Sequence, residues 1–302
     1  EGVGLQRYLP RTNVLVTTFE DGHGTLEVTD FLRVTQRDDD TVCAPRDGSE
    51  LIRRVAVRGG PRRFLFELAP RFRYGTVSPS FRRLDDGLLV TGEDQRFRLA
   101  GPIEGAEERE GTIRFVRTLE PNQTPNYRLQ WGATEPTKSS DVEAALRETI
   151  TRWNDWLDKE RSRDRSWATP YENLLVRSEL VLKLLTQSES GAIAAAATTS
   201  LPEDVGGVRN WDYRFAWIRD ASLTVQALLA VGHSREAREF LSWLERVTSL
   251  RNEEDRIPIL IPLTNLLSTT ERTLDHWEGY RQSRPVRVGN AAACQRQWDA
   301  FG

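Results

Sequence analysis

The stretch "GGVRNWDYRFAWIRDASLTVQALLAVGH", residues 206–233, decides how this chain is interpreted. Its first half gathers aromatic rings, arginines and aspartates between Trp211 and Asp220, and its second half is apolar almost throughout. The second half predicts a helix that is buried on most sides and ends at Gly232, a residue type that commonly terminates helices. Helix packing does not explain the first half, which is therefore a candidate for binding a partner.

The flanking residues predict further helices from Pro170 onward. Ser234 has the residue type of a helix N-cap, with His233 beside it at the helix end, and the helix that follows is amphipathic. Its apolar face contains Ala237, Phe240, Leu241, Leu244 and Val247. An earlier helix has an apolar face of Tyr171, Leu174, Leu175, Leu182 and Leu185. A buried helix followed by an amphipathic one favours a two-layer helical toroid.

Residues 1–136 predict an antiparallel β-sandwich that lacks its first strands. Short segments with alternating apolar residues are separated by turn sequences at regular spacing. Residues 14–34 form a predicted hairpin around the turn "EDGHGT", and residues 51–68 form a second one around Gly59-Gly60. The segments "LLVTGEDQRFRLAG", "GTIRFVRTL" and "NYRLQWG" continue the pattern.

A helix within residues 137–169 is predicted to link this β domain to the helical part, residues 170–302. Ser140 and Glu143 fit a capping box at its start. Apolar residues then recur at helical spacing at Val142, Leu146, Ile150, Trp153 and Leu157. We interpret Trp153, Trp156 and Trp243 as core or domain-interface residues.

Composition excludes several classes of partner. The 42 basic and 45 acidic residues of the 302-residue chain give a net charge of -3, so neither nucleic acid nor an anionic membrane is expected as a partner. No apolar run reaches the roughly 20 residues that span a bilayer. Cys43 and Cys294 are far apart and the three His are scattered, which predicts no metal, no cofactor and a reducing, cytoplasmic compartment.

The residue types in the first half of the opening stretch match the chemistry of a sugar. Arg219 offers a planar fork of donors and Asp220 two acceptors, which together can hold neighbouring hydroxyl groups. Trp211, Tyr213 and Trp217 offer flat apolar faces suited to the C–H faces of a pyranose. The alternative is structural: Arg219 and Asp220 would be an ion pair at a helix start, and the aromatic rings would belong to the core.

The segment "TTSLPEDVGGVRNWDYRFAWIRDASLTVQALLAVGHSREAREFLSWL" resembles glycoside hydrolase family 15, the bacterial glucoamylases and trehalases. "RYLPRTNVLVTTFE", "VTDFL" and "LDHWEGYRQSRPVRVGNAAACQRQWDAFG" resemble other parts of the same family. The resemblance implies an N-terminal β-sandwich followed by an (α/α)6 barrel, of which only the first part is present. It implies that Arg219 and Asp220 bind the glucose at the cleavage site. Its further implied substrate-binding residues are Trp211, Tyr213, Trp217, Arg284 and Arg287.

The resemblance also implies inverting hydrolysis of terminal α-glucosidic bonds, with one Glu as general acid and another as general base. We expect both Glu to lie outside these 302 residues, and we assign the role to none of Glu203, Asp212 and Glu278. The absence of Met and an end inside a helical pattern suggest an internal piece of a longer protein.

Glucoamylase-type cleavage of α-1,4 glucans is the first interpretation of the activity, with an α-glucoside as partner. A trehalase is the close alternative. A sugar phosphorylase, a sugar-binding piece without activity, and a homo-oligomer remain open. The segment "RNEEDRIPILIPLTNLLSTTERTLDH" departs from the family pattern.

Overall fold

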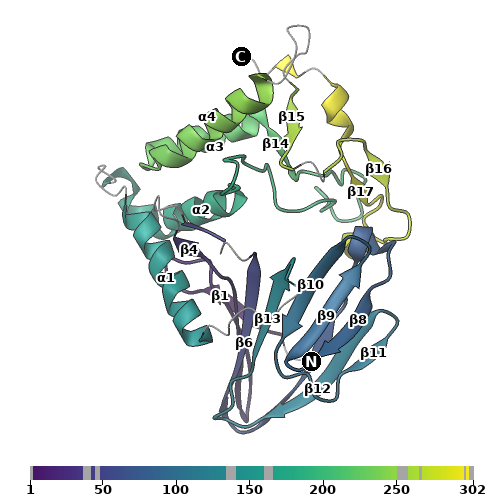
Figure 1. Ribbon diagram of the computed structural model, residues 1–302. Coiled ribbons are helices and arrows are strands. Elements are labelled where there is room, and N and C mark those ends of the chain that lie inside the picture. Colours follow the sequence, from purple (N-terminus) through teal and green to yellow (C-terminus); the bar gives the residue numbers. More distant parts are fainter. Residues whose placement is uncertain are drawn as a thin grey trace. The chain divides into compact units, whose positions relative to one another are not determined.

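The computed structural model describes residues 3–36, 42–44, 48–133, 141–159, 166–249, 258–264, 267–295 and 297–298. The chain divides into two compact units, residues 1–156 and 157–302 (Figure 1). Most of the helix expected within residues 137–169 therefore belongs to the first unit. The boundaries at residues 136 and 169, between the predicted β domain, linker and helical part, stay a prediction.

The first unit is built from antiparallel strands. An eight-stranded sheet has the order β1-β2-β3-β6-β13-β10-β9-β8, and a three-stranded sheet has the order β11-β12-β7. The elements are β1 Leu5–Tyr8, β2 Leu15–Asp21, β3 Gly24–Leu32, β4 Thr35–Gln36, β5 Val42–Cys43, β6 Glu50–Gly59, β7 Arg62–Leu68, η1 Phe72–Gly75, β8 Ser80–Leu84, β9 Gly87–Gly92, β10 Gln95–Ala100, β11 Glu107–Arg109, β12 Thr112–Leu119, β13 Asn126–Trp131 and α1 Val142–Asp158.

The core of this unit lies between the two sheets. Phe66 on β7 and Phe115 on β12 stack with ring centroids 4.8 Å apart, and Tyr127 on β13 lies 4.6 Å from the Phe66 ring. Val90 and Leu99 of the large sheet are fully buried in the same cluster. Alternating apolar residues therefore form one continuous interior between the sheets, and the predicted β-rich N-terminal domain is confirmed.

One predicted hairpin is confirmed and the other is wrong. β2 and β3 pair as expected, with Asp21 opposite Gly24 at the turn. β6 and β7 do not pair, because β6 ends beside β3 and β7 pairs with β12 in the other sheet. The Gly59-Gly60 turn therefore carries the chain from one sheet to the other. A turn signal in the sequence does not distinguish a hairpin from such a crossing.

Helix α1 packs on the open face of the large sheet. Val142 and Ala145 are buried against Val14, Phe31 and Ile52. The side chain of Asp141 accepts a hydrogen bond from the Glu143 amide (3.0 Å), as an N-cap residue does. The capping-box residue proposed from sequence, Ser140, lies outside the described residues. Trp153 and Trp156 are buried, as predicted.

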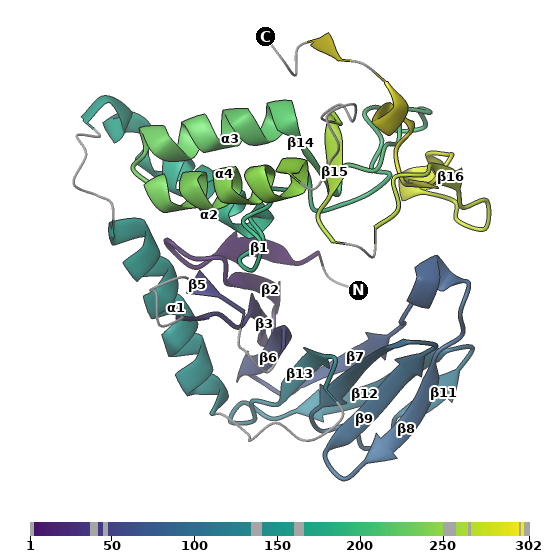
Figure 2. The same ribbon diagram turned by 45° about the horizontal axis from the view of Figure 1, so that its top comes forward.

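The second unit combines helices with short strands (Figure 2). Helices α3 and α4 lie side by side, and Ala221 of α3 packs against Phe240 and Trp243 of α4. The elements are η2 Ser166–Tyr171, α2 Glu172–Leu185, β14 Phe215–Trp217, α3 Ile218–Ala230, α4 Ser234–Ser249, β15 Leu260–Pro262, β16 Arg272–Thr273, η3 Tyr280–Gln282, β17 Arg287–Val288 and η4 Ala291–Cys294.

Burial of the helices differs from the sequence expectation. On α3, Leu223 is 60% exposed, because α3 packs through the face that contains Ala221 and Leu228. On α4, Leu241 is exposed whereas Trp243 is buried. The toroid stays a prediction. None of the helices in the described residues is both long and apolar enough to cross a membrane.

The buried face of α2 is also not the predicted one, since Tyr171 and Leu174 are exposed. The buried residues of α2 include two charged ones, and each of these has a partner near the start of α4. A carboxylate oxygen of Glu179 lies 2.7 Å from Nε2 of His233, and Nζ of Lys183 lies 2.8 Å from an oxygen of Glu236. Buried charges need partners of this kind. The spacing of apolar residues in α2 does not indicate that such partners exist.

Candidate substrate-binding site

The opening motif is positioned by a short strand and the helix that follows it. β14 pairs with β15 so that Trp217 lies opposite Leu260, in the segment that departs from the family pattern. Trp217 is the N-cap of α3, and Asp220 lies in the first turn of this helix. Arg219 and Asp220 therefore belong to the first turn of α3. A carboxylate in a first turn is stabilised by the positive end of the helix dipole.

Asp212 holds the loop before β14 in place. Its carboxylate is fully buried and accepts two hydrogen bonds from the Arg214 guanidinium, at 2.9 Å from Nε and 2.7 Å from Nη2. The Gly289 amide donates to the same carboxylate (3.0 Å), and the side-chain amide of Asn290 donates to the Asp212 carbonyl (3.1 Å). Asp212 therefore joins two segments that are far apart in sequence.

Further hydrogen bonds join the same two segments. The hydroxyl of Ser200 accepts from the Arg287 amide (2.8 Å), and the hydroxyl of Ser283 accepts from the Gly206 amide (2.8 Å). Gly289 has a φ of 74°, and a Cβ there would collide with the Thr270 carbonyl. The positive φ and the close approach of the Thr270 carbonyl thus require glycine at this position.

A cavity of about 390 Å³ opens where these segments meet. This volume is typical of a pocket for a small ligand, roughly 300–1,000 Å³. Nη2 of Arg219 donates to Asp220 (3.0 Å), and about 40% of each side chain is exposed (37% and 41%). The Tyr213 and Trp217 rings lie 5.6 Å apart. The lining residues are Trp211, Tyr213, Trp217, Arg219, Asp220, Glu271, Asn290, Ala291, Ala292, Gln295 and Gln297.

The structure thus brings five of the seven sequence-predicted site residues to one cavity and leaves two outside its lining. Arg284 is exposed. The Arg287 guanidinium stacks over the Trp211 ring, 4.5 Å from its centroid, and donates to the Val208 carbonyl (2.8 Å). Nε of Arg287 lies 3.4 Å from an oxygen of Glu271, which lines the cavity. Arg287 is not in the lining itself and therefore supports two lining residues, Trp211 and Glu271.

Sequence reasoning missed four polar lining residues. Glu271 accepts a hydrogen bond from the Ala291 amide (3.1 Å), and Asn290 caps η4 by accepting from the Ala292 amide (2.9 Å). Gln297 lies 3.5 Å from Nη1 of Arg219, and Gln295 lies beside it. For Asn290, Gln295 and Gln297 the only signal was the segment "GNAAACQRQ", which contributes to the family resemblance but has no residue types specific to one chemistry. Glu271 lies in the segment that departs from the family pattern.

The cavity has an uncharged donor in the hydroxyl of Tyr213. Burial raises the pKa of this phenol above its ordinary value, and the negative charges of Glu203 and Asp220 raise it further. The phenol therefore stays protonated at neutral pH and can donate to a ligand oxygen. In the part of the chain that the structure describes, no group of three or more His, Cys, Asp or Glu side chains is placed to hold a metal ion.

We expect Asp220→Asn to lower the pKa of Tyr213 and Arg209→Gln to raise it, because Asp220 disfavours the phenolate and Arg209 favours it. The folded-state pKa lies above the unfolded one, so this phenol's contribution to stability is complete below the unfolded pKa and is lost as pH rises through the folded pKa. Titration of tyrosinate absorbance measures the shift, and subtraction of the Tyr213→Phe curve assigns it. Equal shifts of one sign in both variants would contradict this assignment.

Two models of known protein families match the chain. Residues 169–302 match the model of glycosyl hydrolases family 15, and residues 2–153 match the model of the trehalase-like N-terminal domain. The chain belongs to glycoside hydrolase family 15. The matched ranges include the β domain and the cavity, so the resemblance carried by the opening motif is confirmed at the level of the family.

Several members of the family are similar to this chain over nearly its whole length. The trehalase of Thermoplasma acidophilum is 33% identical over 98% of this chain and 49% of the relative. The trehalase of Mycolicibacterium smegmatis is 33% identical over 98% of this chain and 47% of the relative. Trehalase 1 of Sulfolobus acidocaldarius is 34% identical over 96% of this chain and 47% of the relative. The chain spans about half the length of these curated relatives.

A solved structure has a similar fold. A putative kojibiose phosphorylase from the human microbiome superposes with a TM-score of 0.50 over 83% of this chain and 37% of the other. The sequence identity is 10%, so the similarity concerns the fold alone.

Proposed function

We propose that the cavity around Arg219 and Asp220 binds the glucosyl unit at the cleavage site of an α-glucoside, and that the full-length protein hydrolyses trehalose with inversion. The observation that carries the proposal is the shared lining: a guanidinium, two carboxylates and three aromatic side chains surround one space of about 390 Å³. Hydroxyl groups of a glucose bind to Arg219 and Asp220, and its apolar faces contact the rings.

The residues of this cavity bind and orient the sugar. Asp220 bonds to Arg219, Glu271 accepts from the Ala291 amide, and Asp212 is fully buried in its own ion pair. Each of these carboxylates is thus engaged, and Glu203 pairs with Arg209 (2.9 Å). We assign the general acid and the general base to none of them. Fixing one sugar ring raises the rate by holding the scissile bond in a reactive geometry.

Trehalose is favoured over an α-1,4 glucan as the substrate. The sequence alone placed glucoamylase first, whereas the relatives that match nearly the whole chain are named trehalase. A glucosyl unit bound by one ring serves both reactions, so the cavity itself does not distinguish them. The choice depends on the residues that contact the second sugar.

The test is turnover of the full-length protein with trehalose, maltose, maltotetraose and isomaltose. We expect trehalose to have the highest kcat/KM. A higher value for maltotetraose would restore the glucoamylase interpretation. Dependence of the reaction on inorganic phosphate would instead support a phosphorylase, and binding of trehalose without turnover would support a sugar-binding protein.

Stereochemistry provides a separate prediction. Trehalose has two α-linked glucose units, so inversion at one of them releases one equivalent of β-glucose and one of α-glucose. Proton NMR during the first minutes, before mutarotation, should therefore show both anomers in equal amounts. Release of α-glucose alone would mean retention and would contradict an inverting mechanism.

A further inference from the structure

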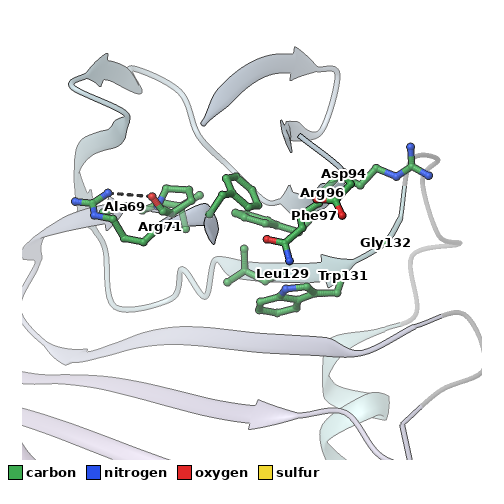
Figure 3. Close-up of a pocket in the computed structure, with 12 residues that line it drawn as sticks. Ala69, Arg71, Asp94, Arg96, Phe97, Leu129, Trp131 and Gly132 are labelled. Carbon is green, nitrogen blue, oxygen red and sulfur yellow. Dashed lines mark hydrogen bonds between the residues drawn. The ribbon is translucent and has the colours of Figure 1, made fainter. Parts of the chain in front are cut away.

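A second cavity lies entirely within the first unit, and the proposed function does not use it (Figure 3). Its volume is about 630 Å³. It lies where β7, η1, the β9–β10 turn and the end of β13 meet, and it shares no lining residue with the Arg219 cavity. The lining residues are Leu68, Ala69, Pro70, Arg71, Phe72, Asp94, Gln95, Arg96, Phe97, Leu129, Trp131 and Gly132.

One wall of this cavity is an aromatic surface that remains open to solvent. Trp131 pairs with Phe97 across β13 and β10, and the two rings lie 5.8 Å apart with a tilt of 34°. Phe97 is supported in turn by Phe72, with centroids 5.9 Å apart. Phe72 and Phe97 are buried, yet Trp131 is 50% exposed. The indole is therefore held in place by the sheet while much of its surface stays uncovered.

Polar groups surround this surface without converging on one point. Asp94, Gln95 and Arg96 are exposed in and after the β9–β10 turn. Both oxygens of Asp94 accept from Nη2 of Arg73 (3.1 Å), which offsets the charge of the carboxylate. Arg71 donates to the Pro70 carbonyl (3.0 Å). Figure 3 shows the Arg71 and Arg96 side chains extending outward at opposite ends of the cavity.

These features select the chemistry of the ligand. A phosphate or carboxylate needs donors that converge, and the two guanidinium groups of the lining diverge. A purely apolar ligand would form no hydrogen bond with the exposed carboxylate and amide of the rim. A neutral molecule with an apolar face and a hydroxyl rim satisfies both parts, because its face covers the indole and its hydroxyls reach Asp94 and Gln95.

We propose that this cavity is a second saccharide-binding site, in which a neutral pyranose lies on the Trp131 indole and bonds to the Asp94 and Gln95 side chains. The site is independent of the Arg219 cavity and of the reaction proposed there. It would hold a sugar unit of an oligosaccharide or polysaccharide on the β domain.

Fluorine NMR of the full-length protein containing fluorotryptophan tests the proposal. The resonance that disappears in Trp131→Phe belongs to Trp131. Trehalose, maltotetraose, cellotetraose and sodium phosphate are the probes. We expect the Trp131 resonance to shift saturably with at least one saccharide and not with phosphate. The shift should persist in Asp220→Asn, in which the first cavity is impaired, so failure of the proposed function would not affect this result.

Matched variants provide the second measurement, saccharide affinity by calorimetry in the Asp220→Asn background. Trp131→Ala should weaken binding about tenfold or more, since it removes the stacking surface. Trp167→Ala removes another exposed tryptophan, one outside the cavity lining, and should leave affinity unchanged. A Trp131 resonance that no saccharide moves would overturn the proposal. So would a phosphate-induced shift, equal affinity of the two alanine variants, or protection of Trp131 from a soluble quencher by the rest of the protein.

Discussion

Arg219→Ala and Asp220→Ala in the full-length protein are each expected to lower kcat/KM for trehalose about 100-fold or more. Each variant removes charge-assisted hydrogen bonds to the reacting sugar, worth about 1.5–3 kcal/mol, and about 1.4 kcal/mol corresponds to a tenfold change. Each also leaves the other member of the pair without its partner at 3.0 Å. Steady-state kinetics with trehalose and maltose measures the effect.

Stability separates this effect from misfolding. The Arg219–Asp220 pair is more than a third exposed, so its loss should change the free energy of unfolding by no more than about 1 kcal/mol. Arg219→Lys retains the charge but loses the planar fork, and we expect it to remain impaired. Arg238→Ala, an exposed arginine on α4, is the matched control with unchanged kinetics. Wild-type kcat/KM in both alanine variants would contradict the assignment.

Asp212→Ala is expected to have the largest effect on stability, a loss of about 3–5 kcal/mol in the free energy of unfolding. The variant leaves Arg214, which is 23% exposed, without the carboxylate that accepts two of its hydrogen bonds. It also deprives the Gly289 amide of its acceptor. Because the same residue holds both segments of the cavity, sugar binding should be lost together with stability. Chemical denaturation measures the free energy.

Two variants test the cause. Asp212→Asn retains an acceptor of the same shape and should be destabilised less than Asp212→Ala. Glu203→Ala breaks an exposed ion pair with Arg209 (side chains 41% and 65% exposed) and should cost at most about 1 kcal/mol. If Asp212→Ala were as stable as Glu203→Ala, Asp212 would not be the residue that joins the two segments.

Much of the local structure follows from sequence patterns with a direct physical cause. The alternation in residues 14–34 predicted the β2–β3 hairpin, because side chains on a strand alternate between faces. Ser234 and the apolar spacing after it predicted α4, whose bounds are Ser234–Ser249. Gly232 follows α3 with a φ of 108°, as expected for a residue that ends a helix. These features depend on neighbours in the sequence alone.

Other features depend on partners that are distant in sequence. The Gly59-Gly60 turn is typical of a hairpin. β7 nevertheless joins the other sheet, because it pairs with β12. The buried face of α2 contains Glu179 and Lys183, because His233 and Glu236 lie opposite them. A prediction from the spacing of apolar residues assigns charged residues to the exposed face of a helix, because that spacing contains no information about such partners.

The candidate site divides in the same way. The sequence by itself determined which residue types gather before α3 and in its first turn, hence a chemistry suited to a sugar. The reason is that one short motif contains Trp211, Tyr213, Trp217, Arg219 and Asp220. Only the tertiary structure decided that Glu271 and Asn290 complete the cavity and that Arg287 supports it from behind. The reason is the fully buried Asp212 carboxylate, whose hydrogen bonds to Arg214 and Gly289 bring together segments that no local pattern connects.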